Sequence, residues 1–390
     1  MAPEGWERKQ IGDVCAAIVD CVNKTAPVVD QPTPYKMIRT TNVRHGRVDT
    51  ESVRYVTEET YRTWTRRGAL RDGDIILTRE APVGEVGQLR NADGMFLGQR
   101  TMVYRADDAL MDQRFLYQSM IGPSLTRQYH ADSAGGTVAH IRVPDCSKFL
   151  LMVPPLPEQR KIADILSTWD QAIEKTEALL SNARTQKRAL MQQLLTGKRR
   201  FSEFEGQPWK EVRLGDVVQC LDNKRVPLNS SQRNEMQGDI PYWGANGIVG
   251  YVNDYIFDEP LVLLAEDGGY FDEFATRPIA SLSYGKAWVN NHAHILRAGE
   301  QVQTEWLYYA LVNRNILGFI NSGTRSKLNK GDMLKIPLEL PSLSEQERIA
   351  EAVGLADRDV TDLEQQITKL RTEKKALMQQ LLTGKRRVVV

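Results

Sequence analysis

Two stretches of the chain place apolar residues in heptads, the spacing of a helix that packs along another helix. In the first stretch the heptad rows contain Leu166, Trp169, Ile173, Leu180, Leu190 and Leu194. In the second stretch they contain Val353, Val360, Leu363, Ile367, Leu370, Leu377 and Leu381. Four to five heptads in each stretch predict two long helices that pair in a coiled coil, with these residues in the seam.

Each predicted helix has clear end signals. Proline-containing segments, PPLPEQ and PSLSEQ, precede the first turn, where a missing N–H costs least. Gly197 and Gly384 follow the last turn, and Lys-Arg-Arg comes next, at the negative end of the helix dipole. Lys187 and Lys374 interrupt one apolar row at the same point. Either their stems run along the seam so that the ammonium reaches water, or they control register.

The two helical stretches are copies of one another. ALMQQLLTGKRR occurs at Ala189–Arg200 and at Ala376–Arg387, and residues 154–200 match residues 341–387 at 23 of 47 positions. A shorter match aligns Trp6 and Gly12-Asp13-Val14 with Trp209 and Gly215-Asp216-Val217. Between these anchors the halves share little. The chain is therefore a tandem repeat that keeps its frame and changes its inserts.

The inserts, residues 1–153 and 201–340, are called here the first and second variable domains. Short apolar runs next to turn residues predict strands at Ile75–Thr78, Thr101–Arg105, Leu261–Ala265 and Ala293–Arg297. Amphipathic helices are expected near Leu110–Ile121 and Glu305–Ile316. The predicted fold class is α+β: two globular domains alternate with two long helices, at 154–200 and 341–390, in a pseudo-two-fold repeat.

Both variable domains have side chains suited to nucleic acid. The first is rich in arginine, which forks onto guanine edges and phosphates, and its candidates are Arg39, Arg44, Arg79 and Arg100. The second offers amides, which can read adenine, and aromatic rings, which can stack. Its candidates are Tyr242, Asn246, Tyr284, Lys286, Asn290, His292, Arg325 and Lys327. The alternative for each residue alone is ordinary surface charge or a core aromatic ring.

The remaining composition points away from catalysis and from membranes. Net charge is only +1, so DNA binding requires local basic surface. The four cysteines form no CxxC pair and predict inert thiols, and His292 and His294 lack further ligands nearby in sequence, so no metal site is expected. No cofactor loop or nucleophile motif is found. With no run of eighteen apolar residues and no signal peptide, a cytoplasmic protein is expected.

Taken together, these features resemble the DNA-specificity (S) subunit of type I restriction–modification systems over nearly the whole chain. The resemblance lies in the two Trp…Gly-Asp-Val starts, the Gly136-Thr137 and Gly323-Thr324 pairs, the PPLPEQRKIA and PSLSEQERIA helix openings, and the LLTGKRR ends. No single motif is specific, but their double occurrence in the same order is.

The resemblance implies a function. Each variable domain would be a target-recognition domain that reads one half of a split, asymmetric site in double-stranded DNA, and the two helices would pair antiparallel and set the gap. Two modification (methyltransferase) subunits would dock and supply S-adenosylmethionine binding, and restriction/translocase subunits would join them. The chain itself would hold no cofactor.

Two expectations remain to be weighed. We expect the repeated Lys-Arg-Arg ends to contact DNA or a partner subunit. The alternative function is a non-catalytic coiled-coil scaffold whose globular domains bind proteins. Salt-dependent binding to duplex DNA discriminates between the two functions, since phosphate contacts weaken steeply with salt.

Overall fold

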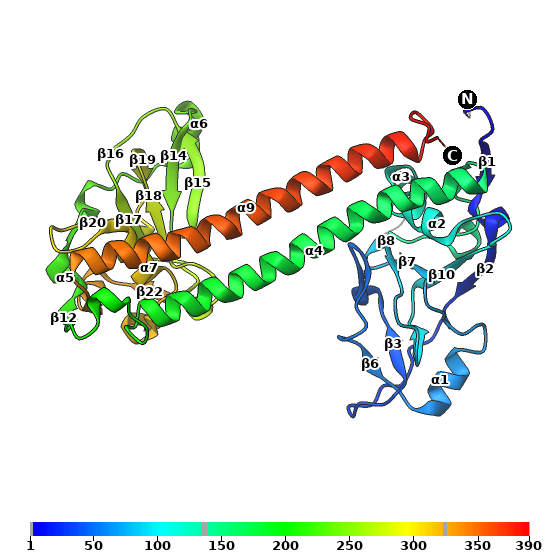
Figure 1. Cartoon of the computed structure of the whole chain (residues 1–390), viewed down its shortest axis with the longest axis horizontal. Helices are drawn as coiled ribbons and strands as arrows, with labels where there is room; N and C mark the ends of the chain where they lie inside the picture. The colour runs from blue at the N-terminus through cyan, green and yellow to red at the C-terminus, as the bar shows by residue number, and fades with distance from the viewer. Residues whose placement is uncertain (1–2, 134–138, 323–325, 390) are drawn as a thin grey trace. The chain divides into compact units, whose positions relative to one another are not determined.

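The computed structural model describes residues 3–133, 139–322 and 326–389. The chain divides into two compact units, Met1–Glu177 with Gln365–Val390, and Ala178–Glu364. Two helices of 39 residues each, α4 (Leu156–Leu194) and α9 (Leu343–Leu381), contribute to both units and are drawn in green and in orange to red in Figure 1. The two long helices predicted from the heptads are therefore confirmed.

The first variable domain is built on a six-stranded sheet of order β2-β10-β7-β8-β5-β4. Its strands are β2 (Cys15–Asp20), β4 (Val43–Arg44), β5 (Gly46–Val48), β7 (Ile75–Arg79), β8 (Val83–Gln88) and β10 (Thr101–Ala106). The domain also holds a small sheet of β3 (Lys36–Ile38), β6 (Arg54–Tyr55) and β9 (Met95–Leu97), and a pair of β1 (Glu7–Gln10) with β11 (Leu150–Val153). The strands predicted at residues 75–78 and 101–105 are β7 and β10.

Both faces of the six-stranded sheet are covered, which is why β7 is apolar at consecutive positions. Ile75 and Leu77 pack with α2 (Gln113–Met120), α3 (Pro123–Asp132) and the nearby ends of α4 and α9. Ile76 faces the other way, toward Ile38 and Leu97. Helix α1 (Glu58–Trp64) covers the small sheet with Tyr61 and Trp64.

The second variable domain repeats the central arrangement of the first. Its sheet β13-β20-β17-β18 has the order of β2-β10-β7-β8, and β12 pairs with β23 as β1 does with β11. These strands are β12 (Lys210–Arg213), β13 (Val218–Cys220), β17 (Leu261–Ala265), β18 (Ala280–Ser283), β20 (Ala293–Ala298) and β23 (Pro337–Leu340). The strands predicted at residues 261–265 and 293–297 are β17 and β20.

The rest of this domain differs from the first. It has a second sheet of β14 (Ile240–Gly244), β15 (Gly247–Val252), β16 (Phe257–Asp258) and β19 (Lys286–Val289), and a hairpin of β21 (Ile320–Ser322) and β22 (Ser326–Leu328). Its helices are α5 (Leu214–Val217), α6 (Ser230–Glu235), α7 (Thr304–Val312) and α8 (Lys330–Met333). Helix α7 ends four residues before the predicted Ile316, since the chain turns at Asn313 and forms a short 3-10 helix at Leu317–Phe319.

Within each unit the two long helices run antiparallel, as interhelical ion pairs show. In unit 1, ascending positions of α4 meet descending positions of α9: Asp170–Lys374 at 2.5 Å and Glu177–Arg371 at 2.8 Å. In unit 2 the corresponding pairs are Arg184–Glu364 at 2.6 Å and Lys187–Asp357. Each pair in one unit equals a pair in the other shifted by 187 residues. These charged positions are identical in both copies because each contributes to a contact between the helices.

Lys187 and Lys374 therefore do more than interrupt an apolar row. Each ammonium reaches an aspartate of the opposite helix, and Lys374 is buried despite its charge. Of the two roles left open by the sequence, the contacts favour control of register and direction, because a misaligned helix would leave each lysine without its aspartate.

The predicted seam residues fall into two groups. Ile173, Val360 and Ile367 are buried, and Trp169, Leu180, Leu190, Leu363, Leu370 and Leu377 are half-buried. Leu166, Leu194, Val353 and Leu381 lie near helix ends and belong to the cores of the variable domains. The helix ends are thus built into the globular parts. In the described part of the chain, no helix is long and apolar enough to cross a membrane.

Candidate nucleic-acid interface

In the first variable domain, three of the predicted arginines gather at the turn that begins at the last residue of β7, residues Arg79–Pro82, here called the β7 turn. The Arg79 amide donates to the Arg100 carbonyl oxygen (2.8 Å), and Arg100 Nε lies 3.2 Å from Glu80 Oε2. Thr40, next to Arg39, donates its hydroxyl to the Ala81 carbonyl oxygen (2.9 Å). Three of the four predicted arginines, Arg39, Arg79 and Arg100, are therefore brought together.

The β7 turn has an unusual backbone. The non-glycine residues with positive φ in the described ranges are His45, Ala81 and Arg100, at 53°, 50° and 68°. Two of these three belong to the turn or contact it. Such conformations cost free energy and persist where the surrounding structure holds them in place, often at functional sites. The geometry fixes the direction in which Arg100, half-exposed, presents its guanidinium.

In the second variable domain, the predicted polar residues gather at the equivalent turn after β17, residues Glu266–Gly269, here called the β17 turn. Asn246 donates to the Gly268 carbonyl oxygen (2.9 Å), and His292 Nδ1 lies 3.7 Å from Asp267 Oδ2. The Asn290 side chain accepts from the His292 amide (2.8 Å). Lys327 Nζ lies 3.1 Å from Glu266 Oε1.

The two turns occupy the same place in the repeat. In the first domain, the backbones of Glu80 and His140 form an isolated antiparallel β-bridge, and the Ile141 amide donates to the Arg79 carbonyl oxygen. In the second domain, the backbones of Asp267 and Lys327 form the same kind of β-bridge, and the Leu328 amide donates to the Glu266 carbonyl oxygen. Each of these residues lies 187 positions from its counterpart. One backbone frame thus presents arginines in the first domain and amides, a histidine and a lysine in the second.

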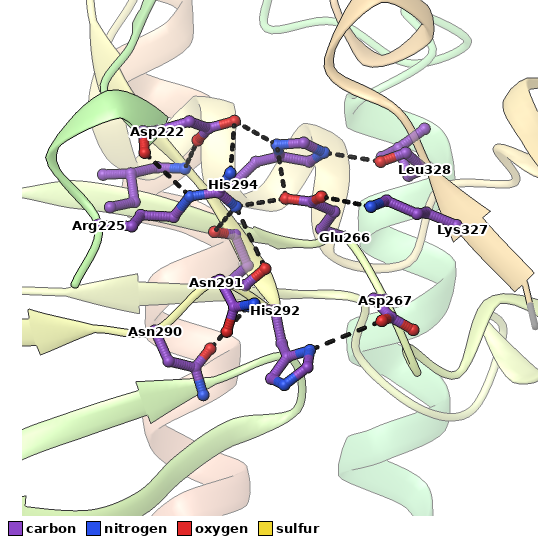
Figure 2. Close-up of polar contacts among 12 residues, drawn as sticks. Asp222, Arg225, Glu266, Asp267, Asn290, Asn291, His292, His294, Lys327 and Leu328 are labelled. Carbon is purple, nitrogen blue, oxygen red and sulfur yellow. Dashed lines mark hydrogen bonds and ion pairs between the residues drawn. The ribbon is translucent and has the colours of Figure 1, made fainter. Parts of the chain in front are cut away.

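A buried charge network supports the β17 turn (Figure 2). His294, 1% exposed, contacts Asp222 through Nδ1 (2.6 Å) and the Leu328 carbonyl oxygen through Nε2 (2.8 Å). The Arg225 guanidinium donates to Glu266 and lies 3.6 Å from Asp222. The close-up shows His294 and His292 directed to different partners: His294 lies in β20, whereas His292 lies in the turn before that strand.

The carboxylates of this network are held ionised. Burial alone would raise the pKa of Asp222, but hydrogen bonds from His294 and the Ile295 amide lower it to about 2. For Glu266, burial is likewise outweighed by hydrogen bonds from Arg225 and Lys327, which lower its pKa. Both groups therefore carry full negative charge near neutral pH.

Cys220, Asp222 and His294 have ligand atoms within 4.8 Å of one another, a grouping that by residue type could hold a metal ion. The surroundings do not suit a dication. Burial raises the pKa of the Cys220 thiol, and Arg225 already supplies positive charge beside the carboxylates. A thiolate and an uncompensated carboxylate would be needed for tight binding. The trio is better described as part of the ion network.

The long helices carry a second repeated cluster, which joins each variable domain to them. Trp209 Nε1 donates to Glu345 (2.9 Å), and Arg200 binds the same carboxylate through Nε (2.8 Å) and Nη2 (2.6 Å). In the other unit, Trp6, Arg387 and Glu158 make the same contacts at 3.0, 2.7 and 2.8 Å. We call each set a Trp–Glu–Arg clamp. Arg200 and Arg387 bind buried carboxylates, and the expected contact of the Lys-Arg-Arg ends with DNA or a partner stays a prediction.

The repeated Glu-Gln pair at each helix start is explained by these contacts. Next to the clamp glutamate, Gln159 accepts from the Asp112 amide (2.8 Å) and donates to the Leu110 carbonyl oxygen (3.0 Å). Gln346 makes the matching contacts with Gln303 and Gln301. The glutamine therefore fixes the loop before α2 or α7 on the long helix.

The model of the type I restriction modification DNA specificity domain matches residues 3–181 and 206–370. The chain belongs to this family.

Individual relatives agree with the family. The chain is 25% identical to the type I restriction enzyme MjaVIII specificity subunit of Methanocaldococcus jannaschii, over 99% of this chain and 94% of that protein. It is 37% identical over 164 residues to the putative type I restriction enzyme specificity subunit S.HindORF215P of Haemophilus influenzae, a match that covers 42% of this chain and 38% of that protein. The crystal structure of the type I restriction–modification system S subunit from M. genitalium shares the fold, with a TM-score of 0.64 and 17% identity over 97% of this chain and 96% of that one.

Several of the predicted DNA-binding residues lie away from the β7 turn and the β17 turn. Tyr242 is 2% exposed and its hydroxyl accepts from the Leu228 amide (3.0 Å), so its position is that of a core residue and we leave it out of the proposed surface. The Tyr284 hydroxyl donates to the Glu305 carboxylate. The pKa of Tyr284 is raised, first by burial and second by this hydrogen bond. Lys286 lies over the Tyr255 ring at 4.5 Å.

Arg44 is exposed in β4 and lines a groove of about 1020 Å³ in unit 1, which Arg371 and Lys375 also line. Arg325 and the two Gly-Thr pairs lie outside the described residues.

The sequence did not single out the residues that support the second turn, namely Asp222, Arg225, Glu266 and His294. One signal was present: the 187-residue offset continues through Glu80 and Asp267, both acidic, and marks the two turns as equivalent. The network itself joins residues up to 72 positions apart, and no local pattern reveals such pairs.

Proposed function

We propose that this chain is the DNA-reading subunit of a type I restriction–modification complex. Each variable domain reads one half of a bipartite, asymmetric site in duplex DNA, with the β7 turn and the β17 turn as the reading surfaces. The supporting observation is that one frame, repeated at a fixed offset, carries different side chains in its two copies. Two halves of an asymmetric site require such a pair of surfaces.

We propose further that other subunits of the complex carry out methylation and cleavage. Two modification subunits supply S-adenosylmethionine binding and adenine methylation, and restriction/translocase subunits supply cleavage. The chain is non-catalytic, and its cytoplasmic location, expected from the sequence, belongs to the proposal. Arginines in the first domain favour guanine, and the amides in the second favour adenine.

The test is methylation mapping of DNA from cells that make the chain with its modification subunits. We expect a motif of two fixed half-sites separated by a gap of constant length. Arg100→Gln is expected to relax one half-site only, and Asn246→Ala the other half-site only. A single undivided motif, or changes in both halves from either substitution, would contradict the assignment.

The scaffold function that binds proteins makes a different prediction. It requires that the purified chain show no salt-dependent affinity for duplex DNA, whereas phosphate contacts make affinity fall as salt rises. Measuring the affinity at several salt concentrations separates the two.

A further inference from the structure

Both ring nitrogens of His294 face oxygen atoms (Figure 2). Nε2 faces the Leu328 carbonyl oxygen at 2.8 Å, and a carbonyl oxygen only accepts hydrogen bonds. Nδ1 faces Asp222 Oδ2 at 2.6 Å, and the other oxygen of this carboxylate accepts from the Ile295 amide at 2.9 Å. Both ring nitrogens must therefore donate, and the ring is an imidazolium.

The charges around His294 then add up to a surplus. The buried carboxylates are Asp222 and Glu266, and the cations against them are His294 and Arg225, both largely shielded from water. These two cations balance the two carboxylates. Lys327, whose side chain is 47% exposed, is a third cation at Glu266. Among the groups that contact Asp222 and Glu266, its charge is the one left over, and it lies at the surface beside the β17 turn, where Asp267 is the next carboxylate along the chain.

His294 also fixes the position of Lys327. In β22, the Leu328 amide donates to the Glu266 carbonyl oxygen (2.8 Å), and the Leu328 carbonyl oxygen accepts from His294. Leu328, the residue next to Lys327, is therefore held by hydrogen bonds at both its amide and its carbonyl group.

The fold does not require a histidine at this position. Register places His294 opposite Leu264 in the second domain, and Met102 opposite Leu77 in the first. Leu77 and Leu264 are equivalent in the repeat, so Met102, 2% exposed, takes the place of His294. The charge network is thus an addition to the second domain.

We propose that His294 is a positioning residue for DNA binding by the second variable domain: its imidazolium balances the buried carboxylates and holds β22, so that Lys327 keeps a positive charge for a DNA phosphate. The inference rests on the proposed function. If the ring were neutral, the positive charge of Lys327 would be needed to neutralise Glu266, and the contact of Lys327 with a DNA phosphate would weaken.

The test uses the full chain and a mixed-sequence DNA duplex, with affinity measured as a function of salt concentration. Lys327→Ala is expected to lower the slope of log affinity against log salt by about one phosphate contact. His294→Gln, neutral and able to donate to the Leu328 carbonyl oxygen, is expected to lower it equally. The double variant is expected to lose no more than either single one, because both act on one charge.

A rescue variant separates this role from a structural one. Adding Glu266→Gln to His294→Gln removes one buried negative charge and leaves Asp222 balanced by Arg225. We expect the slope to return to that of the wild type. A purely structural role predicts no rescue, since a second substitution in the network would further disturb the fold.

Nuclear magnetic resonance of the wild-type chain labelled with ¹⁵N-histidine keeps the inference testable if a variant fails to fold. The spectrum is expected to show His294 doubly protonated at neutral pH. The groups that face the ring are Cys220, Asp222, Glu266 and Arg225, with Lys327 beyond Glu266.

A neutral His294, or a wild-type slope in His294→Gln while Lys327→Ala loses a contact, would overturn the inference and leave the proposed function standing. Absence of any salt-dependent DNA binding by the wild type would contradict the proposed function, and this inference with it.

Discussion

Single buried carboxylates join the globular and helical parts of this protein. Glu345 is 1% exposed, and it is satisfied by an indole N–H and by two guanidinium nitrogens of Arg200. A buried carboxylate with such partners contributes little over an apolar contact, but removing its charge strands the cation opposite. The clamp residues are therefore sensitive to the loss of one partner.

Glu345→Gln is expected to lower the free energy of unfolding by about 3 kcal/mol, because Arg200 would stay largely buried without a counter-charge. Denaturant unfolding followed by tryptophan fluorescence measures the loss. The matched control is Glu158→Gln, where a smaller loss is expected because Arg387 is 45% exposed and water can solvate it. Equal losses in the two variants would contradict this explanation.

Asp222 makes the stability of the second domain depend on acid pH. Its folded pKa, about 2, lies below the value near 3.9 of an unfolded aspartate, so its stabilisation is complete above that value and is lost as pH falls through about 2. The shift corresponds to about 2 kcal/mol. The difference in unfolding free energy between wild type and Asp222→Asn is expected to shrink between pH 4 and pH 2. A difference that stays constant across this range would show that Asp222 does not act through its charge.

The positions of residues at the turns were predictable where a local pattern defines them. Asn246, His292 and Lys327 were chosen for their chemistry in turn-rich segments, and they meet at the β17 turn. Tyr242 was chosen on the same grounds and is buried, because alternation in β14 turns it toward Val252 and Trp288. The charges of Lys327 and Arg100 are each shared with a carboxylate, and such partners come from distant parts of the chain.

At the scale of elements, the heptads predicted both long helices because the pattern repeats over many turns and its ends carry proline and glycine signals. Gly197 and Gly384 have φ of 67° and 68°, the left-handed conformation that ends a helix. The small sheets β6-β3-β9 and β15-β14-β19-β16 were not predicted, since each contains a parallel pairing between distant segments. Only tertiary contacts define such strands.

The interhelical ion pairs predict how α4 and α9 choose their register. Asp170→Lys places two cations together at Lys374 and is expected to destabilise unit 1, with Lys374→Asp doing the same. The two substitutions together restore an opposite-charge pair and should recover at least about 1 kcal/mol relative to the sum of the single losses. A double-mutant cycle in denaturant unfolding measures this coupling. Additive losses would mean that the pair does not act as a unit.

At the scale of the whole molecule, the repeat makes the helix contacts self-complementary. The ion pairs described above in one unit have their counterparts in the other, so residues 158–200 carry both members of each pair: Asp170 with Lys187, Glu177 with Arg184, and Glu158 with Arg200. A second copy of residues 158–200 could therefore replace residues 345–387 without loss of these ion pairs.

Residues 1–200 alone are expected to form a symmetric dimer for this reason. Sedimentation measures the state, and together with modification subunits the dimer is expected to direct methylation to a palindrome of the first half-site. Lys187→Asp is expected to weaken the dimer, and Asp170→Lys in the same fragment to restore it. A monomeric fragment, or a dimer indifferent to both substitutions, would count against the self-complementary pairing.

The two Trp–Glu–Arg clamps also make the order of segments along the chain interchangeable. One clamp joins Arg200 to Trp209 through a continuous backbone, whereas the other joins Arg387 to Trp6 by contact alone, with Arg387 also bound to the Glu4 carbonyl oxygen at 2.8 Å. The clamp of Arg387 and Trp6 thus forms without a continuous backbone between these residues. By symmetry, we expect that the clamp of Arg200 and Trp209 does not need one. A circular permutant that links residue 388 to residue 3 and opens the backbone between residues 201 and 208 is expected to fold and to bind DNA like the parent. A permutant opened within β7 serves as the control and is expected to fail. If both fail, the connection between Arg200 and Trp209 holds the second unit together in a way that the clamp cannot replace.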